Sequence, residues 1–98
     1  MYQTITIVLP SYKSRKLLLN HIKNTSKKIK IIIVDNSNDK KLQKEFKNKF
    51  KNVSVLLRKN IGYGAAINFG SKYVKTKYLL PRKEVAEPNI HAIKFEKP

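Results

Sequence analysis

The stretch Ile29-Lys30-Ile31-Ile32-Ile33-Val34-Asp35 carries the clearest fold signal in this sequence. It is short, rich in β-branched side chains and almost continuously apolar, and it stops at a carboxylate. Alternating apolar and polar residues mark a strand with one face in water, whereas an unbroken apolar run is typical of a parallel strand covered on both faces. The stretch therefore predicts an inner strand of a parallel sheet.

Strand-like and helix-like segments alternate on either side of this run. Strands are predicted over residues 4–9 and 53–57 and from residue 78 onward, and helices over residues 14–22, 42–50 and 65–75. Ser14 offers a helix N-cap, and residues 36–39 form a turn and cap cluster. Leu42, Phe46 and Phe50 recur at the spacing of an amphipathic helix. This alternation predicts an α/β fold with an open, mostly parallel sheet.

Residues 81–98 depart from the rhythm of the preceding chain. Pro81 interrupts the fourth strand, a polar stretch follows it, and residues 90–95 have the pattern of a weak strand. The sequence therefore predicts one incomplete α/β region, residues 1–80, followed by a divergent C-terminal tail, residues 81–98.

The composition is strongly basic. The chain has 98 residues, enough for one small domain, and carries 22 Lys and Arg against 6 Asp and Glu, for a formal net charge of +16. Such a charge favours anionic partners such as nucleic acid or a membrane surface. Part of it reflects a bias toward Lys, Ile and Asn that an AT-rich coding sequence would produce. The absence of Cys and the wide separation of His21 and His91 exclude a disulfide framework and a zinc-type cluster.

The sequence contains no recognisable targeting or membrane-spanning segment. The apolar run 5–9 ends at Pro10 and is too short for a signal-peptide core, and the run 31–34 is far below the ~20 residues that span a bilayer. We therefore expect a cytoplasmic chain. The Lys-rich segment 41–51 is expected to be a solvated helix face, with peripheral contact to an anionic membrane as the alternative.

Two common phosphate-binding devices are excluded. A dinucleotide-binding turn needs glycines after the first strand, where this chain has Pro10-Ser11-Tyr12-Lys13-Ser14. A Walker-type loop needs Gly-Lys-Ser/Thr, whereas Gly70-Ser71-Lys72 has the wrong order and lies within a predicted helix. Neither NAD nor P-loop nucleotide binding is supported.

Three segments nevertheless form a familiar set. They are Ile5-Thr6-Ile7-Val8-Leu9-Pro10-Ser11-Tyr12, Ile31-Ile32-Ile33-Val34-Asp35-Asn36-Ser37, and Asn60-Ile61-Gly62-Tyr63-Gly64-Ala65-Ala66-Ile67-Asn68-Phe69-Gly70. In this order and spacing they resemble the start of family-two glycosyltransferases of the GT-A fold, over residues 4 to about 80. The resemblance implies that residues 1–80 are the nucleotide-binding half of such a fold, which is Rossmann-like.

The resemblance also implies a site for a nucleotide-diphosphate sugar. Pro10 and Tyr12 would line the pocket for the base and ribose, and Asp35 would accept a hydrogen bond from the base, commonly uracil in this family. Asn60, Gly62 and Asn68 would lie beside the ribose and diphosphate. General chemistry agrees, because a strand-end carboxylate accepts well from a base N–H and a helix N-terminus favours a diphosphate.

The same residues also allow purely structural interpretations. Asp35 has the position of a turn or cap residue. Gly62 and Gly64 have the position of a turn before a helix, where the glycines would also let a ligand approach the backbone. Gly70 is expected to be a close-packing residue.

The motif that would hold the family's divalent metal, Mg or Mn, is missing. In the family it is an Asp-x-Asp-type motif at the end of the fourth strand, where this chain continues from Leu80 with Pro81-Arg82-Lys83. The catalytic base lies still further along the family's domain. We therefore expect no catalytic or metal-binding residue in this chain, a truncation before both motifs, and a partner chain as one source of the missing half.

The function expected from the resemblance is that of a glycosyltransferase. It would bind a nucleotide-diphosphate sugar, of the uridine type, for sugar transfer to a cell-envelope or lipid-linked acceptor. The alternative is a small basic nucleic-acid-binding or membrane-surface module without enzymatic activity. Against nucleic acid, Arg is scarce, and no RNA-recognition signature is present.

Overall fold

The computed structural model describes residues 4–59, 61–82 and 93–94. Its elements follow one another as β1 (Ile5–Ser11), α1 (Arg15–Lys23), β2 (Lys30–Asp35), α2 (Lys40–Lys49), β3 (Val53–Leu57), α3 (Tyr63–Ser71), β4 (Tyr78–Pro81) and β5 (Ile93–Lys94). The strands form one sheet in the order β3-β2-β1-β4-β5. The first four pair in parallel and β5 pairs antiparallel with β4, so the predicted open, mostly parallel α/β sheet is confirmed.

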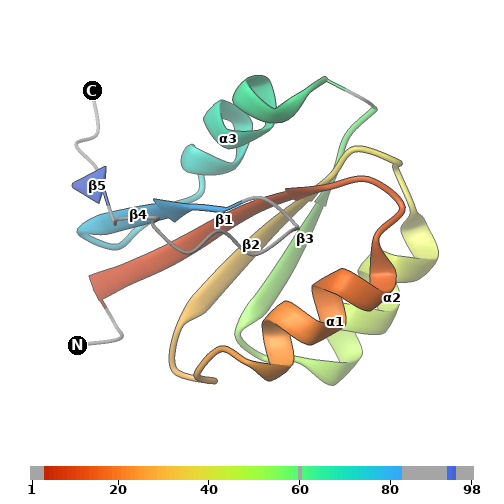
Figure 1. Ribbon diagram of the computed structural model, residues 1–98, viewed down its shortest axis with the longest axis horizontal. Coiled ribbons are helices and arrows are strands. Elements are labelled where there is room, and N and C mark those ends of the chain that lie inside the picture. The colour runs from red at the N-terminus through yellow and green to blue at the C-terminus, as the bar shows by residue number, and fades with distance from the viewer. Residues whose placement is uncertain (1–3, 60, 83–92, 95–98) are drawn as a thin grey trace.

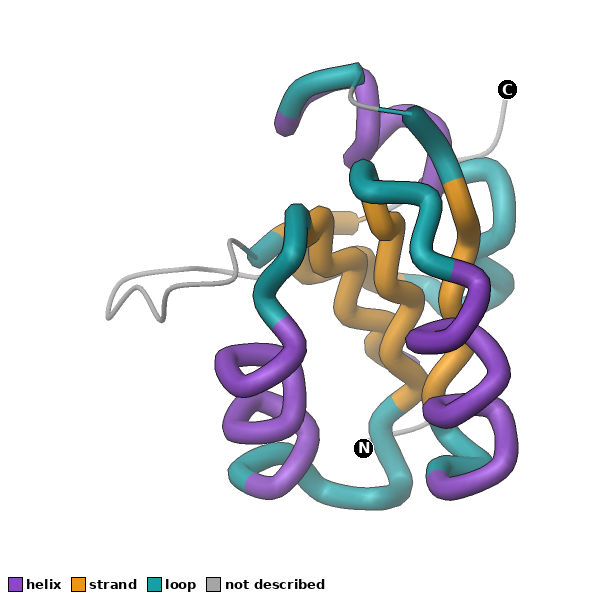
Figure 2. Tube along the Cα trace, turned by 90° about the vertical axis from the view of Figure 1, so that its right-hand side faces the viewer, coloured by secondary structure: helices purple, strands orange, loops and turns teal. Residues whose placement is uncertain are grey.

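Helices cover both faces of the sheet. α1 and α2 lie together on one face and α3 lies on the other (Figure 1). The view toward the ends of β1, β2 and β3 also shows helices on different sides of the strands (Figure 2). The strand order explains the change of face. α1 and α2 carry the chain outward from β1 to β3, whereas α3 carries it back past β1 to β4, and right-handed crossovers in opposite directions place their helices on opposite faces.

The side chains of β2 divide between two hydrophobic clusters. Ile31 and Ile33 belong to the cluster under α1 and α2, whereas Ile32 and Val34 belong to the cluster under α3. All four side chains are at most 2% exposed. Because helices cover the strand on both faces, every position of the run can be apolar, and the predicted inner strand is confirmed.

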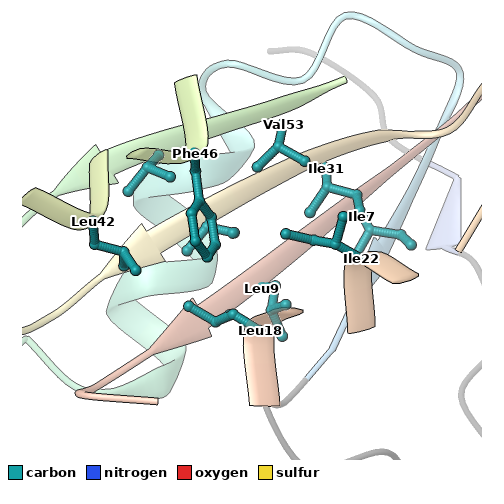
Figure 3. Close-up of a cluster of buried hydrophobic side chains, with 10 residues drawn as sticks. Ile7, Leu9, Leu18, Ile22, Ile31, Leu42, Phe46 and Val53 are labelled. Carbon is teal, nitrogen blue, oxygen red and sulfur yellow. The ribbon is translucent and has the colours of Figure 1, made fainter. Parts of the chain in front are cut away.

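The cluster under α1 and α2 is built around Phe46. Figure 3 shows Phe46 and Leu42 pointing from α2 toward the sheet, beside Leu18 and Ile22 from α1. The Phe46 ring is fully buried and packs edge to face on Phe50, with 5.4 Å between ring centroids. The predicted amphipathic face of this helix is therefore confirmed, although Phe50 is its C-cap and not part of its last turn.

α3 approaches the sheet most closely at Gly70. A Cβ atom at this position would lie 2.6 Å from Cγ1 of Val8 and 3.0 Å from Cγ2 of Val34. These separations are far below the normal contact distance of ~3.5–4 Å between carbon atoms, so only hydrogen fits. The prediction that Gly70 is a close-packing residue is confirmed.

β1 extends beyond its predicted end at Leu9, through Pro10 to Ser11. The carbonyl of Val8 accepts a hydrogen bond from Arg82 N after β4, and the carbonyl of Ser11 accepts one from Asn36 N after β2. Since alternate residues of a strand use opposite sides, the nitrogen of Pro10 faces the β4 side. Among the described residues, the pairing of β1 with β4 ends at Val8. The missing N–H of Pro10 therefore removes no hydrogen bond between these two strands in the described part of the chain.

The helix ends differ from the predictions in two places. Ser14 precedes α1 as predicted, but its hydroxyl donates to the carbonyl of Tyr12 at 2.7 Å and makes no cap bond to the helix. α3 begins at Tyr63 and ends at Ser71, where the sequence predicted residues 65–75. Val74 is buried although it lies after the end of the helix. Because its apolar side chain fits the helical spacing, the sequence pattern predicted a helix that continues past Ser71.

The described part of the C-terminal tail is short. Pro81 was predicted to interrupt the fourth strand, but it is the last residue of β4, and Arg82 follows it. β5 covers residues 93–94, within the weak strand predicted over residues 90–95, and residues 83–92 and 95–98 lie outside the described part of the chain. Among the helices that the structure describes, none combines the length and apolar character needed to cross a bilayer.

Candidate functional site

The ends of β1, β2 and β3 are joined directly by backbone hydrogen bonds. Ser11 and Asp35 are register partners in the β1–β2 pairing, and Asn36 N donates to the carbonyl of Ser11 at 2.8 Å. Arg58 N, just after β3, donates to the carbonyl of Asp35 at 2.9 Å. The ends of these three strands therefore lie together at one edge of the sheet, the edge where α/β proteins bind ligands.

Asp35 lies at the centre of this edge and is fully buried. Its Oδ1 accepts hydrogen bonds from the backbone N–H of Ser37 at 3.1 Å and from the Ser37 hydroxyl at 2.6 Å. Its Oδ2 accepts one from the backbone N–H of Asp39 at 2.7 Å. The predicted turn role of Asp35 is thus observed, because its carboxylate holds the loop between β2 and α2.

Asp39 continues this arrangement into the next helix. Its Oδ1 accepts from the backbone N–H groups of Lys41 and Leu42, at 3.0 and 3.1 Å, and it is the N-cap of α2. The turn and cap cluster predicted over residues 36–39 is confirmed. Asp35 therefore fixes the start of α2 as well as the end of β2.

Asn36 ties the end of β2 to the loop before α3. It is 7% exposed, and its Oδ1 accepts a hydrogen bond from the backbone N–H of Ile61 at 3.2 Å. From the sequence, Asn36 is expected only as a member of the turn and cap cluster 36–39, with no separate role. The position of Asn36 directly after the strand-end residue Asp35 could have indicated this role, because Asn side chains commonly form hydrogen bonds with the backbone of turns and loops.

α3 starts at Tyr63, directly after the loop that Asn36 ties to the end of β2. Gly62 is the N-cap, with φ of +83°, a left-handed value that favours glycine, and it supplies no side-chain cap. The first turn holds no acidic side chain. An uncapped helix N-terminus carries a partial positive charge and N–H donors that suit an anion. At Gly64, by contrast, an added Cβ atom would have no other atom within 4 Å, so packing does not require a glycine at this position.

Pro10 and Tyr12 flank the end of β1 in different environments. Pro10 is buried within the strand, whereas Tyr12 is 47% exposed, with Nζ of Lys13 5.3 Å from the centre of its ring. Between them, Ser11 is 3% exposed, and its Oγ makes no hydrogen bond to any residue that the structure describes. Tyr12 therefore presents an accessible aromatic ring at this edge.

The remaining predicted residues lie further out. Asn60 is outside the described residues. Asn68 is exposed on α3, five positions after the first helical residue, which is about 8 Å along the helix axis at 1.5 Å per residue. The structure thus brings Pro10, Tyr12, Asp35 and Gly62 to one edge and leaves Asn68 more than one turn away.

Positive charge dominates the surroundings of the edge. The guanidinium of Arg58 lies 4.5 Å from the centre of the Phe69 ring on α3, so a cation–π contact holds it beside the loop that leads to Gly62. Lys59, the next residue, is exposed. These cations and the start of α3 favour an anionic ligand.

The described residues do not suit a divalent metal at the end of β4. The last two described residues there are Pro81 and Arg82, and the Nε of Arg82 is buried without a hydrogen bond to any described residue. The carboxylate of Asp35, at the end of β2, is committed to its own loop. No group of three potential metal-binding side chains occurs within residues 4–59, 61–82 and 93–94. We therefore derive no chemistry through a metal from these residues.

Glu45 forms an ion-pair cluster that joins the two helices on one face. Nε and Nη2 of Arg15 each donate a hydrogen bond to the carboxylate of Glu45, and Nζ of Lys49 donates one to the same carboxylate at 2.9 Å. These bonds, with Arg15 as the larger cause, lower the pKa of Glu45 to about 2. The cluster links α1 to α2 and holds the start of α1, which follows Tyr12, against its neighbour.

Known families and structures match most of this chain. The sequence profile of the family described as "Glycosyl transferase family 2" matches residues 6–81. Two crystal structures of S. aureus TarS 1-349, the second in complex with UDP, match with a TM-score of 0.63 and sequence identities of 24% and 26%. Each match covers 83% of this chain and 27% of the TarS chain, so this chain spans about a quarter of that structure's length. No curated protein matches it.

Proposed function

This chain belongs to glycosyl transferase family 2, and we propose that the carboxyl ends of β1, β2 and β3 bind the nucleotide of a nucleotide-diphosphate sugar, with uridine as the nucleoside. The observation that carries the proposal is the hydrogen-bonded junction of these three ends, where Ser11, Asp35, Asn36 and Arg58 are linked through their backbones. UDP is the ligand of one TarS structure with the same fold.

Each part of the edge suits a different part of this ligand. Tyr12 offers an exposed ring against which a base or ribose can pack. The uncapped start of α3 at Gly62, together with Arg58 and Lys59, suits the diphosphate. Asn60 and Asn68 are proposed, from the family resemblance, to contact the ribose and diphosphate, and Asn68 would have to reach them from the second turn of α3.

Asp35 has one constraint in this role. A carboxylate has about four acceptor sites, and three hydrogen bonds to the loop are already made. One site is therefore left for a base N–H, but the side chain is fully buried. Base recognition through Asp35 requires a small displacement of residues 36–39. Ser11 is the register partner of Asp35 in β1, and Pro10 precedes it in that strand, so Pro10 is proposed to contact the base or ribose next to this position.

The complete reaction is also proposed from the family. It is the transfer of a sugar to a cell-envelope or lipid-linked acceptor, in the cytoplasm or at its membrane face, with Mg or Mn as the expected metal. The described residues supply the nucleotide half of such a reaction, and the carboxylates for the metal and for acceptor activation are proposed to come from outside them.

Titration of the purified chain with uridine diphosphate, followed by calorimetry, tests the proposal. We expect saturable binding that weakens as salt is added, because the diphosphate meets positive charge. Cytidine and adenosine diphosphates serve as controls for base recognition, and inorganic pyrophosphate serves for charge alone. A folded sample that does not bind uridine diphosphate at millimolar concentration, or binds pyrophosphate equally well, would rule the proposal out.

A further inference from the structure

A hollow lies at the other end of the sheet from the candidate nucleotide site. Its volume is about 760 Å³. It lies between the ends of α1 and α2 and is lined by Leu19, Ile22, Lys23, Thr25, Lys27, Lys49, Phe50, Lys51 and Asn52. Asn52 precedes β3, and its carbonyl accepts from the backbone N–H of Ile31 at the start of β2. The hollow therefore faces the amino ends of the strands.

The floor of this hollow is apolar. It is formed by Leu19 and Ile22 from α1 and by Phe50 from the end of α2. Ile22 belongs to the core, and Leu19 and Phe50 are partly buried against the same cluster. The floor is thus an opening onto the core between the two helices, and an apolar group of a ligand would find there a surface held rigid by the packing below it.

The rim of the hollow is basic. Lys23, Lys27, Lys49 and Lys51 surround the floor. Lys49 is paired with Glu45, whereas the other three lysines make no ion pair with any residue that the structure describes. Both helices end here, so the rim also offsets the partial negative charge of their last carbonyl groups, and an excess of positive charge remains for an external anion.

We propose that this lysine-rimmed groove, defined by the nine lining residues above, binds an anionic phospholipid. The phosphate lies among Lys23, Lys27 and Lys51, and the first methylene groups of an acyl chain lie on Leu19, Ile22 and Phe50. The combination of apolar floor and cationic rim matches a headgroup joined to a chain. It does not match the sugar–phosphate backbone of a nucleic acid, which offers no aliphatic segment to the floor. The volume lies within the range of small-molecule sites.

Co-sedimentation with vesicles tests this assignment on the full chain. We expect binding to vesicles of phosphatidylcholine mixed with phosphatidylglycerol and little binding to phosphatidylcholine alone. Each Lys at an anionic surface contributes about fivefold in affinity, so the triple variant K23Q/K27Q/K51Q should bind about a hundredfold more weakly. The matched control, K72Q/K75Q/K77Q, removes the same charge from exposed lysines after α3 and should lose less than tenfold.

The role of the apolar floor needs a separate measurement. By NMR, a soluble short-chain phosphatidylglycerol should shift the amide signals around Leu19 and Phe50 at concentrations where glycerol phosphate leaves them unchanged. Equal binding by the two triple variants would show attraction by net charge alone and would overturn the proposal. Equal binding of the short-chain lipid and glycerol phosphate would overturn it as well, as would absence of vesicle binding. None of these outcomes affects the nucleotide site, which lies at the other end of the sheet.

Discussion

The backbone N–H of Ile61 donates to the side-chain Oδ1 of Asn36 across a distance of 3.2 Å. This bond joins the end of β2 to the loop that leads into α3. The same segment of β2 also carries Asp35, whose carbonyl accepts from Arg58 at the start of that loop. The neighbouring residues Asp35 and Asn36 thus hold Arg58 and Ile61, on either side of the loop between β3 and α3. These two hydrogen bonds therefore help to position the N-terminus of α3.

Replacing Asn36 by Ala should weaken nucleotide binding by releasing this loop. The Ile61 N–H would lose its partner, at a cost of about 1–2 kcal/mol in the free energy of unfolding. We expect the dissociation constant for uridine diphosphate to rise about tenfold. Asn48→Ala, an exposed position on α2, is the matched control and should leave both quantities unchanged. Equal binding by the two variants would contradict this role for Asn36.

Replacing Asp35 by Asn should destabilise the fold itself. One carboxylate oxygen becomes an NH₂ group, which must face either the Ser37 or the Asp39 N–H, so a donor meets a donor. Loss of a charge-assisted bond in a buried site costs about 2 kcal/mol, measurable as a lower midpoint in urea unfolding. A variant as stable as the parent would show that the loop does not depend on this carboxylate.

Two glycines of α3 should respond in opposite directions to substitution by Ala. Gly70→Ala places a methyl group against Val8 and Val34 and should cost roughly 1–3 kcal/mol through overpacking. Gly64→Ala meets open space and should be neutral or stabilising by about 0.5–1 kcal/mol, because Ala loses less backbone entropy in a helix. Thermal unfolding of the two variants measures the difference, and similar effects would contradict the described packing of α3.

The Glu45 cluster makes one contribution to stability that depends on pH. Because the folded-state pKa is lowered from 4.5 to about 2, the ionised form is favoured by folding. The contribution is present above pH 4.5 and is lost as the pH falls toward 2. Glu45→Gln should therefore lower the urea midpoint slightly at pH 7, less at high salt, and the difference from the parent should vanish near pH 2. A constant difference at all pH values would exclude the ion pair as its cause.

The layer arrangement was predictable because its signal is local. The apolar run of β2 admits few alternatives to a strand covered on both faces, and the spacing of Leu42 and Phe46 fixes the buried side of α2. Gly70 was also predictable as a packing residue, since a glycine inside a helix otherwise lowers stability.

Features that depend on tertiary contacts were not predictable in the same way. β1 can continue through Pro10 because its pairing with β4 ends at Val8. The sequence of β1 alone does not indicate where this pairing ends. The end of α3 at Ser71 was misjudged because Val74 is buried by the sheet after the helix has ended. The Asn36–Ile61 bond spans 25 positions, and no local pattern connects the two residues.

The central claim is that the joined ends of β1, β2 and β3 form a nucleotide site, and amide chemical-shift mapping with uridine diphosphate tests it most directly. We expect amide chemical-shift changes that saturate with added uridine diphosphate and are largest at Tyr12, Asn36 and Gly62. The amide signals of Lys23 and Lys51 should not change. Shifts confined to the lysine-rimmed groove, or none at millimolar ligand in a folded sample, would contradict it.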